Sequence, residues 1–115
     1  MRYITLIYGN EAAEASFSPE EQQAQFAAHI AYAQELREKG VMKGGDPLLP
    51  TSAATTVRVR DSKALTTHGP FAETAEQLGG YYVIECANLD EALAWAAKNP
   101  SATYGSIEVR PVMEF

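Results

Sequence analysis

Two histidines are the side chains of this sequence best suited to proton transfer, because the ordinary pKa of imidazole, about 6.5, lies close to neutrality. His29 follows Phe26 by three residues and precedes Ala33 by four, at the margin of an apolar helical stripe. From there the imidazole could face a cleft beside the Gly44-Gly45-Asp46 loop, where Asp46 would fix its tautomer. The alternative is a half-buried histidine that hydrogen-bonds only to backbone. We therefore treat His29 and Asp46 as a candidate acid–base pair.

Five further side chains are candidate ligand contacts. His68 opens a Gly-Pro turn, where an exposed residue making a local hydrogen bond is the alternative. Phe71 is expected to plug a pocket or a subunit seam. Arg58 and Arg110 alternate with apolar residues on two strands, so each could pair with a glutamate on a neighbouring strand or clamp a ligand carboxylate. Tyr81 is expected in the core, at an interface or in an apolar ligand pocket.

The motifs of several other chemistries are missing. The sequence has no phosphate-cradling glycine loop, no G-x-S-x-G elbow, and no C-x-x-C or H-x-x-x-H spacing. We therefore expect neither a metal nor a cofactor. Cys86 is the single cysteine and lies in an apolar run, which predicts a buried, inert thiol and fits a reducing compartment.

The composition is that of a globular protein with one domain over residues 1–115. Apolar residues make up 46% and charged residues 21% of the chain. A net charge of −6 argues against binding to nucleic acid or to an anionic membrane surface, since both require clustered cations. The amino terminus lacks a signal-peptide pattern, and no segment approaches the roughly 20 apolar residues of a membrane span. We expect a cytoplasmic protein.

Three local sequence signals agree in predicting one helix. Ser18 is suited to the N-cap, Pro19 to the first helical position and Glu21 to a capping box, and Gly40 would end the helix. Its apolar stripe is expected to face the core and consists of Phe26, Ile30, Ala33 and, at one margin, Leu36.

The remaining segments alternate between strands and a second helix. We expect strands over residues 3–8, 56–60, 80–86 and 106–110, a hairpin arm over 64–67, a helix over 89–97, loops over 11–17 and 41–52, and a short helical turn within 72–78. This order predicts an α+β fold, the ferredoxin-like split βαβ sandwich, in which both helices cover one face of an antiparallel sheet.

The strands at 3–8 and 81–86 are apolar or aromatic on both faces. A sheet wetted on one side would alternate more cleanly. Since the chain offers no third layer, we expect a second copy to cover the free face and form a homodimer.

The stretch HGPFAETAEQLGGYY, residues 68–82, resembles the signature of the YCII-related family, in particular its DGPF branch. That resemblance implies a dimeric α+β barrel. Some relatives are thought to use a His–Asp pair for acid–base chemistry, and His29 matches the histidine on their first helix. Asp46 would be the partner by its position in the Gly-Gly loop. His68 replaces the aspartate that opens the branch's motif.

Two functions follow as hypotheses. The first is a small-molecule enzyme in which His29 moves a proton on an organic acid or ring held in the barrel cavity. The alternative is a non-catalytic ligand-binding or accessory module associated with transcription regulation, because DGPF-type proteins often accompany sigma factors. In either case the 68–71 and 44–47 loops are expected to frame one cleft.

Overall fold

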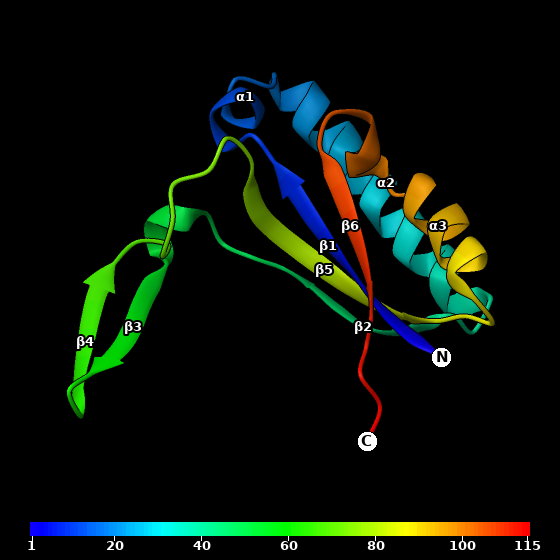
Figure 1. The fold of residues 1–115 in the computed structure, drawn as a ribbon. Coiled ribbons are helices and arrows are strands. Elements are labelled where there is room, and N and C mark those ends of the chain that lie inside the picture. Colours follow the sequence, from blue (N-terminus) through cyan, green and yellow to red (C-terminus); the bar gives the residue numbers. More distant parts are fainter.

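The central strand of the sheet is β1 (Arg2–Gly9), which pairs antiparallel with β5 (Gln77–Glu85) on one side and β6 (Ser106–Pro111) on the other. The edge strand β2 (Met42–Pro47) pairs with β5, giving the order β2-β5-β1-β6. The structure, a computed structural model, describes residues 1–115. Helices α2 (Pro19–Glu38) and α3 (Leu89–Ala97) lie together on one face of this sheet (Figure 1). This is the predicted ferredoxin-like α+β sandwich.

Helix α2 begins and ends as its sequence predicts. Ser18 Oγ accepts from Glu21 N at 3.1 Å, and a Glu21 carboxylate oxygen accepts from Ser18 N at 3.1 Å, which completes the capping box. At the other end Gly40 adopts a φ of +70°, and Val41 N donates to Leu36 O at 2.9 Å. This Schellman closure brings buried Leu36 and buried Val41 together. None of the chain's helices is both long and apolar enough to cross a membrane.

The core lies between the helices and the sheet. From α2 it receives Tyr32 and Leu36, which pack against Tyr3 and Ile84 of the sheet, and Tyr32 OH also donates to Trp95 O in α3 at 2.7 Å. The predicted stripe of α2 is therefore correct only at Leu36. Phe26 and Ile30 are 69% and 53% exposed, because their side of the helix borders a cavity instead of the core.

The edge strand β2 is the second strand along the chain, and it lies in a segment for which the sequence predicted a loop. The predicted strand at 56–60 exists, but it belongs to a separate hairpin of β3 (Thr55–Arg60) and β4 (Lys63–His68) that projects away from the sheet (Figure 1). Asp61 and Ser62 form its two-residue turn with φ values of 51° and 63°, the conformation of a type I′ turn. Strand β3 is therefore not a neighbour of β6, and the pairing of Arg58 with a glutamate of strand 106–110, which required neighbouring strands, does not form.

Three short segments complete the chain. The predicted loop at 11–17 contains a helical turn, α1 (Glu11–Ala15), because the Asn10 side chain caps it by accepting from Ala13 N at 2.9 Å. Two 3₁₀ turns, η1 (Thr51–Ala53) and η2 (Pro100–Thr103), follow β2 and α3. The helical turn predicted within 72–78 does not form. Gly69 just after β4 has a φ of +102°, which fits the sharp bend expected there.

The sheet face away from the helices carries Ile4 and Leu6 of β1, which pair with Val83 and Tyr81 of β5. We call this side the open face. Its residues are only half-buried, whereas Tyr3 and Thr5 on the helix side are almost fully buried. The predicted two-sided apolar character of these strands is therefore present, and a single chain covers one side of it.

Candidate functional site

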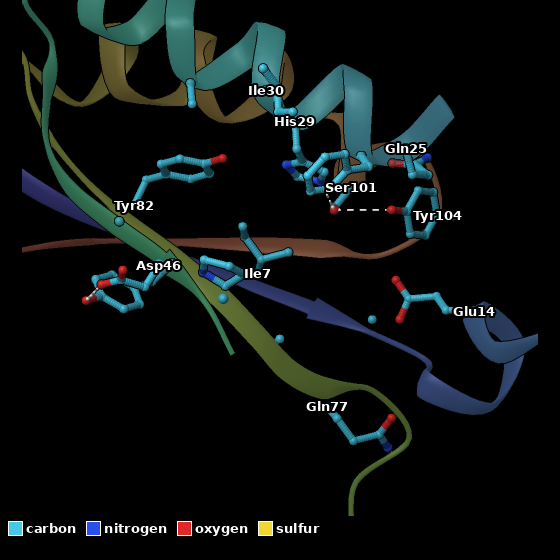
Figure 2. A pocket seen from close by; sticks show the side chains of 18 of the residues that line it. Ile7, Glu14, Gln25, His29, Ile30, Asp46, Gln77, Tyr82, Ser101 and Tyr104 are labelled. Carbon is cyan, nitrogen blue, oxygen red and sulfur yellow. Dashed lines mark hydrogen bonds between the residues drawn. The ribbon is translucent and has the colours of Figure 1, made fainter. Parts of the chain in front are cut away.

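A cavity of about 540 Å³ lies between α2 and the sheet. Helix α2 lines it with residues spaced three or four apart, so that they share one side of the helix: Phe26, His29, Ile30, Ala33 and Arg37. The ends of β1 and β5 form the floor, α1 and η2 close one end, and the edge strand β2 flanks the other (Figure 2). The helix side that the sequence assigned to the core thus forms the wall of a cavity.

His29 is held by a hydrogen bond from the far end of the chain. Its Nε2 lies 2.9 Å from Ser101 Oγ, and Ser101 Oγ lies 3.3 Å from Tyr104 OH (Figure 2). Ser101 is fixed in turn because its backbone N donates to Asn99 Oδ1 at 2.9 Å, the N-cap interaction of η2. The other ring nitrogen of His29, Nδ1, makes no hydrogen bond within the protein and is not buried. Nδ1 is therefore available to a ligand.

Partial burial lowers the pKa of His29 below its ordinary value, because the charged imidazolium loses solvation. The neutral ring is then the main form near pH 7. The tautomer of His29 depends on the direction in which the hydrogen bonds run through the hydroxyl groups of Ser101 and Tyr104. If Nε2–H donates to Ser101 Oγ and Ser101 donates to Tyr104, Nδ1 carries a lone pair and acts as a base. If the chain runs the other way, Nδ1–H acts as an acid.

Three more polar groups in the cavity lack partners in the protein. The Oε1 atom of Gln25 is buried without a hydrogen bond, and the Tyr82 hydroxyl makes none. Burial raises the pKa of Tyr82, and Arg37 acts in the opposite direction, so the guanidinium lies close enough to favour the phenolate. Arg37 itself forms no ion pair. Unpartnered polar groups that converge on a concave, largely apolar space are typical of ligand sites.

Two carboxylates of α1 line the end of the cavity opposite Arg37. Glu11 is structural, since it accepts from Thr51 N at 2.9 Å and from Thr51 Oγ1 at 2.8 Å. Glu14 has no such partner, and its carboxylate lies over Gly9, where a Cβ would stand 2.9 Å from Oε2. Burial, and then the nearby Glu11 and Glu76, raise the pKa of Glu14. The cavity therefore has a cation at one end and a carboxyl group of raised pKa at the other.

Asp46 does not hold the tautomer of His29. It accepts a hydrogen bond from Tyr81 OH at 2.7 Å, and this bond raises the pKa of Tyr81. Tyr82 packs its ring on Tyr32 of α2, so its neighbour Tyr81 and the cross-strand residue Asp46 point to the opposite side of the sheet. The predicted contact between His29 and Asp46 is absent, although both residues contribute to the cavity lining.

The other four candidates lie away from His29. His68 and Arg58 are exposed on the hairpin, and Arg110 pairs with Glu108 of its own strand. Phe71 is 77% exposed and lines a second cavity of about 580 Å³ at the root of the hairpin. The loops at 68–71 and 44–47 thus contribute to different cavities, and the single cleft expected from the sequence does not form.

Sequence reasoning missed Ser101, Tyr104 and Glu14. Asn99-Pro100 is typical of the end of a helix, but nothing in the pattern shows that the next residue faces a histidine 72 positions earlier. Glu14 lay in a segment expected to be a loop. The structure has no group of three or more His, Cys, Asp or Glu side chains placed to hold a metal ion.

Comparison with known proteins shows which family this chain belongs to and which fold it shares. The family model of the YCII-related domain matches residues 1–115. An uncharacterised protein of Rhizobium meliloti (strain 1021) is 40% identical over 114 residues, which cover 97% of this chain and 92% of that protein. Among solved structures, 5-chloro-2-hydroxyhydroquinone dehydrochlorinase from Burkholderia phenoliruptrix, in complex with 2,5-dihydroxybenzoquinone, matches with a TM-score of 0.59 and 16% identity, over 100% of this chain and 96% of that chain. At this identity the likeness shows a common fold.

Proposed function

The chain belongs to the YCII-related domain family, and we propose that it is an enzyme in which His29 moves a proton on a small hydroxylated ring. One observation carries the proposal: the imidazole is anchored at Nε2 by Ser101 and presents a free Nδ1 to the cavity. A general base needs both a fixed orientation and an accessible nitrogen. A histidine that served only the core would have both nitrogens bonded or enclosed.

The shape and polarity of the cavity favour a flat ring as substrate. Phe26 and Ile30 offer apolar surface on the helix side, and Tyr82 faces them from the sheet. Arg37 would hold an ionised ring oxygen, since a guanidinium forms strong hydrogen bonds with anions. The dehydrochlorinase that shares this fold was solved with a dihydroxylated quinone, and we adopt that class of molecule for this chain.

The proton transfer follows from the state of the ring nitrogens. Neutral His29 accepts a proton at Nδ1 from a hydroxyl or ring carbon, and the electron pair released enters the ring. On a chlorinated ring, His29 returns this proton to the carbon that bears chlorine, and loss of a second hydroxyl proton then drives chloride from that carbon, so that hydrogen chloride is lost in total without any oxidant or reductant. The imidazolium then donates Nε2–H to Ser101 Oγ, which supports the charged form while it lasts. Release of the proton to water restores the base.

The same proposal includes a homodimer. Ile4, Leu6 and Val83 of the open face leave apolar surface that a single chain does not cover. A second copy related by a two-fold axis would cover it, and a stable contact of this kind buries about 1,200 Å² or more. Sedimentation equilibrium over micromolar concentrations measures this association directly.

The catalytic role is tested with 2,5-dihydroxybenzoquinone as the binding probe and chloride release from 5-chloro-2-hydroxyhydroquinone as the activity. We expect the wild type to bind the probe by calorimetry and His29→Asn to lose chloride release by at least about a hundredfold, the usual contribution of a general base. His68→Asn is the matched control, because it makes the same change at an exposed histidine outside the cavity.

Two results would contradict the proposal. In one, the probe binds neither the wild type nor the control at millimolar concentration. In the other, His29→Asn retains the chloride release of His68→Asn and instead loses about 1–3 kcal/mol of unfolding free energy, as expected for a purely structural histidine. The second result would leave the protein as a binding module or structural domain.

A further inference from the structure

The β3–β4 hairpin has two chemically different faces. Residues paired across antiparallel strands point to the same side, so Val57 with Thr66 and Val59 with Ala64 form an apolar face. The opposite face carries the three cations Arg58, Arg60 and Lys63, with Leu65 as the apolar neighbour of Arg58. Such alternation is the pattern of a ribbon whose apolar side is covered.

Nothing in the chain covers that apolar face. All residues of β4 are exposed, and Val57 and Val59 are 60% and 61% exposed. At the root Thr56 Oγ1 donates to Gly69 O at 2.8 Å, but no hydrogen bond or ion pair joins residues 57–68 to the sheet or the helices. An isolated two-stranded hairpin is marginally stable in water, so its order calls for a partner.

The charge of the hairpin points to the kind of partner. Residues 55–68 carry three cations and one anion, a net charge of +2, so the remainder of a chain with net charge −6 carries −8. None of the hairpin cations takes part in the ion pairs of the chain, which involve Arg2, Lys43, Lys98 and Arg110. The basic hairpin of one copy is therefore complementary in charge to the acidic remainder of another copy of the same protein.

The position of the root supports the same partner. Tyr8, which alternates with Leu6 on the open face, lines the cavity at the root together with Thr55 and Phe71. The hairpin thus leaves the body beside the face assigned above to a second copy, and it extends away from its own sheet (Figure 1). In a two-fold dimer, each arm then reaches across the other subunit.

We propose that the β3–β4 hairpin is a dimerisation arm, whose apolar face of Val57, Val59, Ala64 and Thr66 docks on the open-face side of a second copy of this chain. The proposal rests on the homodimer proposed above and adds the element that clasps it. The basic face of the arm stays on the outside of the ribbon, where its cations add a long-range attraction to the acidic partner.

The test compares single charges on the two faces of the arm. Val59→Glu places a carboxylate on the apolar face, and Leu65→Glu places one on the basic face beside its cross-strand neighbour Arg58. Val59 is 61% exposed and Leu65 is 50% exposed, so neither change should disturb the fold of the subunit. We expect sedimentation equilibrium to show a dimer dissociation constant at least about tenfold higher for Val59→Glu than for Leu65→Glu, a difference of about 1.4 kcal/mol.

A truncated arm provides the second measurement. Replacing residues 57–66 by Asn-Gly keeps the Thr56–Thr67 pair and shortens the hairpin to its root. This variant should dimerise more weakly than the wild type. Its circular dichroism should show that the four-stranded sheet and the helices are intact, and its chloride release per folded subunit should equal that of the wild type. Equal dimer constants for the wild type, Val59→Glu and the truncation would overturn the arm proposal and leave the dimer standing. A wild type that stays monomeric would overturn both the arm and the dimer, and the His29 experiments would still decide the catalytic proposal.

Discussion

Replacing Ser101 by alanine removes the one group that anchors the His29 ring. The hydroxyl lies 2.9 Å from His29 Nε2, and Ser101 is 6% exposed. A hydrogen bond between neutral groups contributes about 1 kcal/mol net, so the unfolding free energy should fall by about that amount. For a chain of 115 residues this corresponds to a melting temperature lower by about 4 °C.

The functional loss should exceed this modest structural one. Without Ser101 Oγ the imidazolium has no acceptor at Nε2, so the pKa of His29 should fall still further below its ordinary value. The ring would also rotate freely, and maximal turnover should drop by roughly tenfold or more. The rise of turnover with pH should shift to lower pH while its plateau falls.

Thr103→Ala is the matched control for Ser101→Ala. Thr103 lies in the same 3₁₀ turn and donates to Pro100 O at 3.0 Å, but it makes no contact with His29. NMR titration of the His29 ring and the pH profile of chloride release would be measured on both variants. If Ser101→Ala and Thr103→Ala give the same His29 titration and the same turnover, Ser101 does not position the His29 ring.

The remaining predictions concern packing and pH. Gly105→Ala should cost about 1–3 kcal/mol or more in urea unfolding, because a Cβ there would stand 2.2 Å from Tyr8 O and neither backbone can easily move. Glu14→Gln should raise the melting temperature at pH 7, because a carboxyl group whose pKa is raised on folding destabilises the folded state once it is ionised. The gain in melting temperature should vanish below about pH 4.5, the ordinary pKa of the carboxyl group. A gain that stays constant with pH would contradict this prediction. The pKa of His29 is instead lowered on folding, so its stabilising effect is complete above about pH 6.5 and is lost on acidification. The wild type should therefore lose more stability than His29→Asn between pH 7 and pH 5, as thermal scans at each pH would show.

The sequence predicts the elements whose signals are local. The capping box at Ser18 and the glycine at 40 define α2 within one residue at each end, because each depends on backbone groups a few positions away. The strand β2 was missed for a related reason. Gly44-Gly45-Asp46-Pro47 has the composition of a turn, yet Gly45 is required by packing: a Cβ there would stand 2.7 Å from the Tyr82 ring and 2.9 Å from Tyr81 O. Only the folded sheet reveals that requirement.

The candidate site was predictable in part for the same physical reason. His29 could be selected because its chemistry is rare and its position on a helix follows from the periodicity. Its partner could not, since Ser101 is a common residue brought close by the packing of α2 on η2. Asp46 is the better partner by charge, but strand alternation turns it to the other face beside Tyr81. Assigning Asp46 to one face of the sheet requires the register of β2 on β5, and the sequence did not predict β2 as a strand.

The topology of the sheet also bears on how the chain folds during synthesis. The strand β1 is the first to leave the ribosome, yet both of its neighbours, β5 and β6, lie in the last third of the chain. The nascent chain must therefore carry an apolar strand with two unpaired edges until β5 has been made and with one unpaired edge until β6 has been made, while α2 can form at once from its own caps. Folding of the sheet should be later than that of α2, because its strand pairs have a high contact order. Nascent chains are accordingly most exposed to aggregation, and most dependent on chaperones, before β5 and β6 emerge.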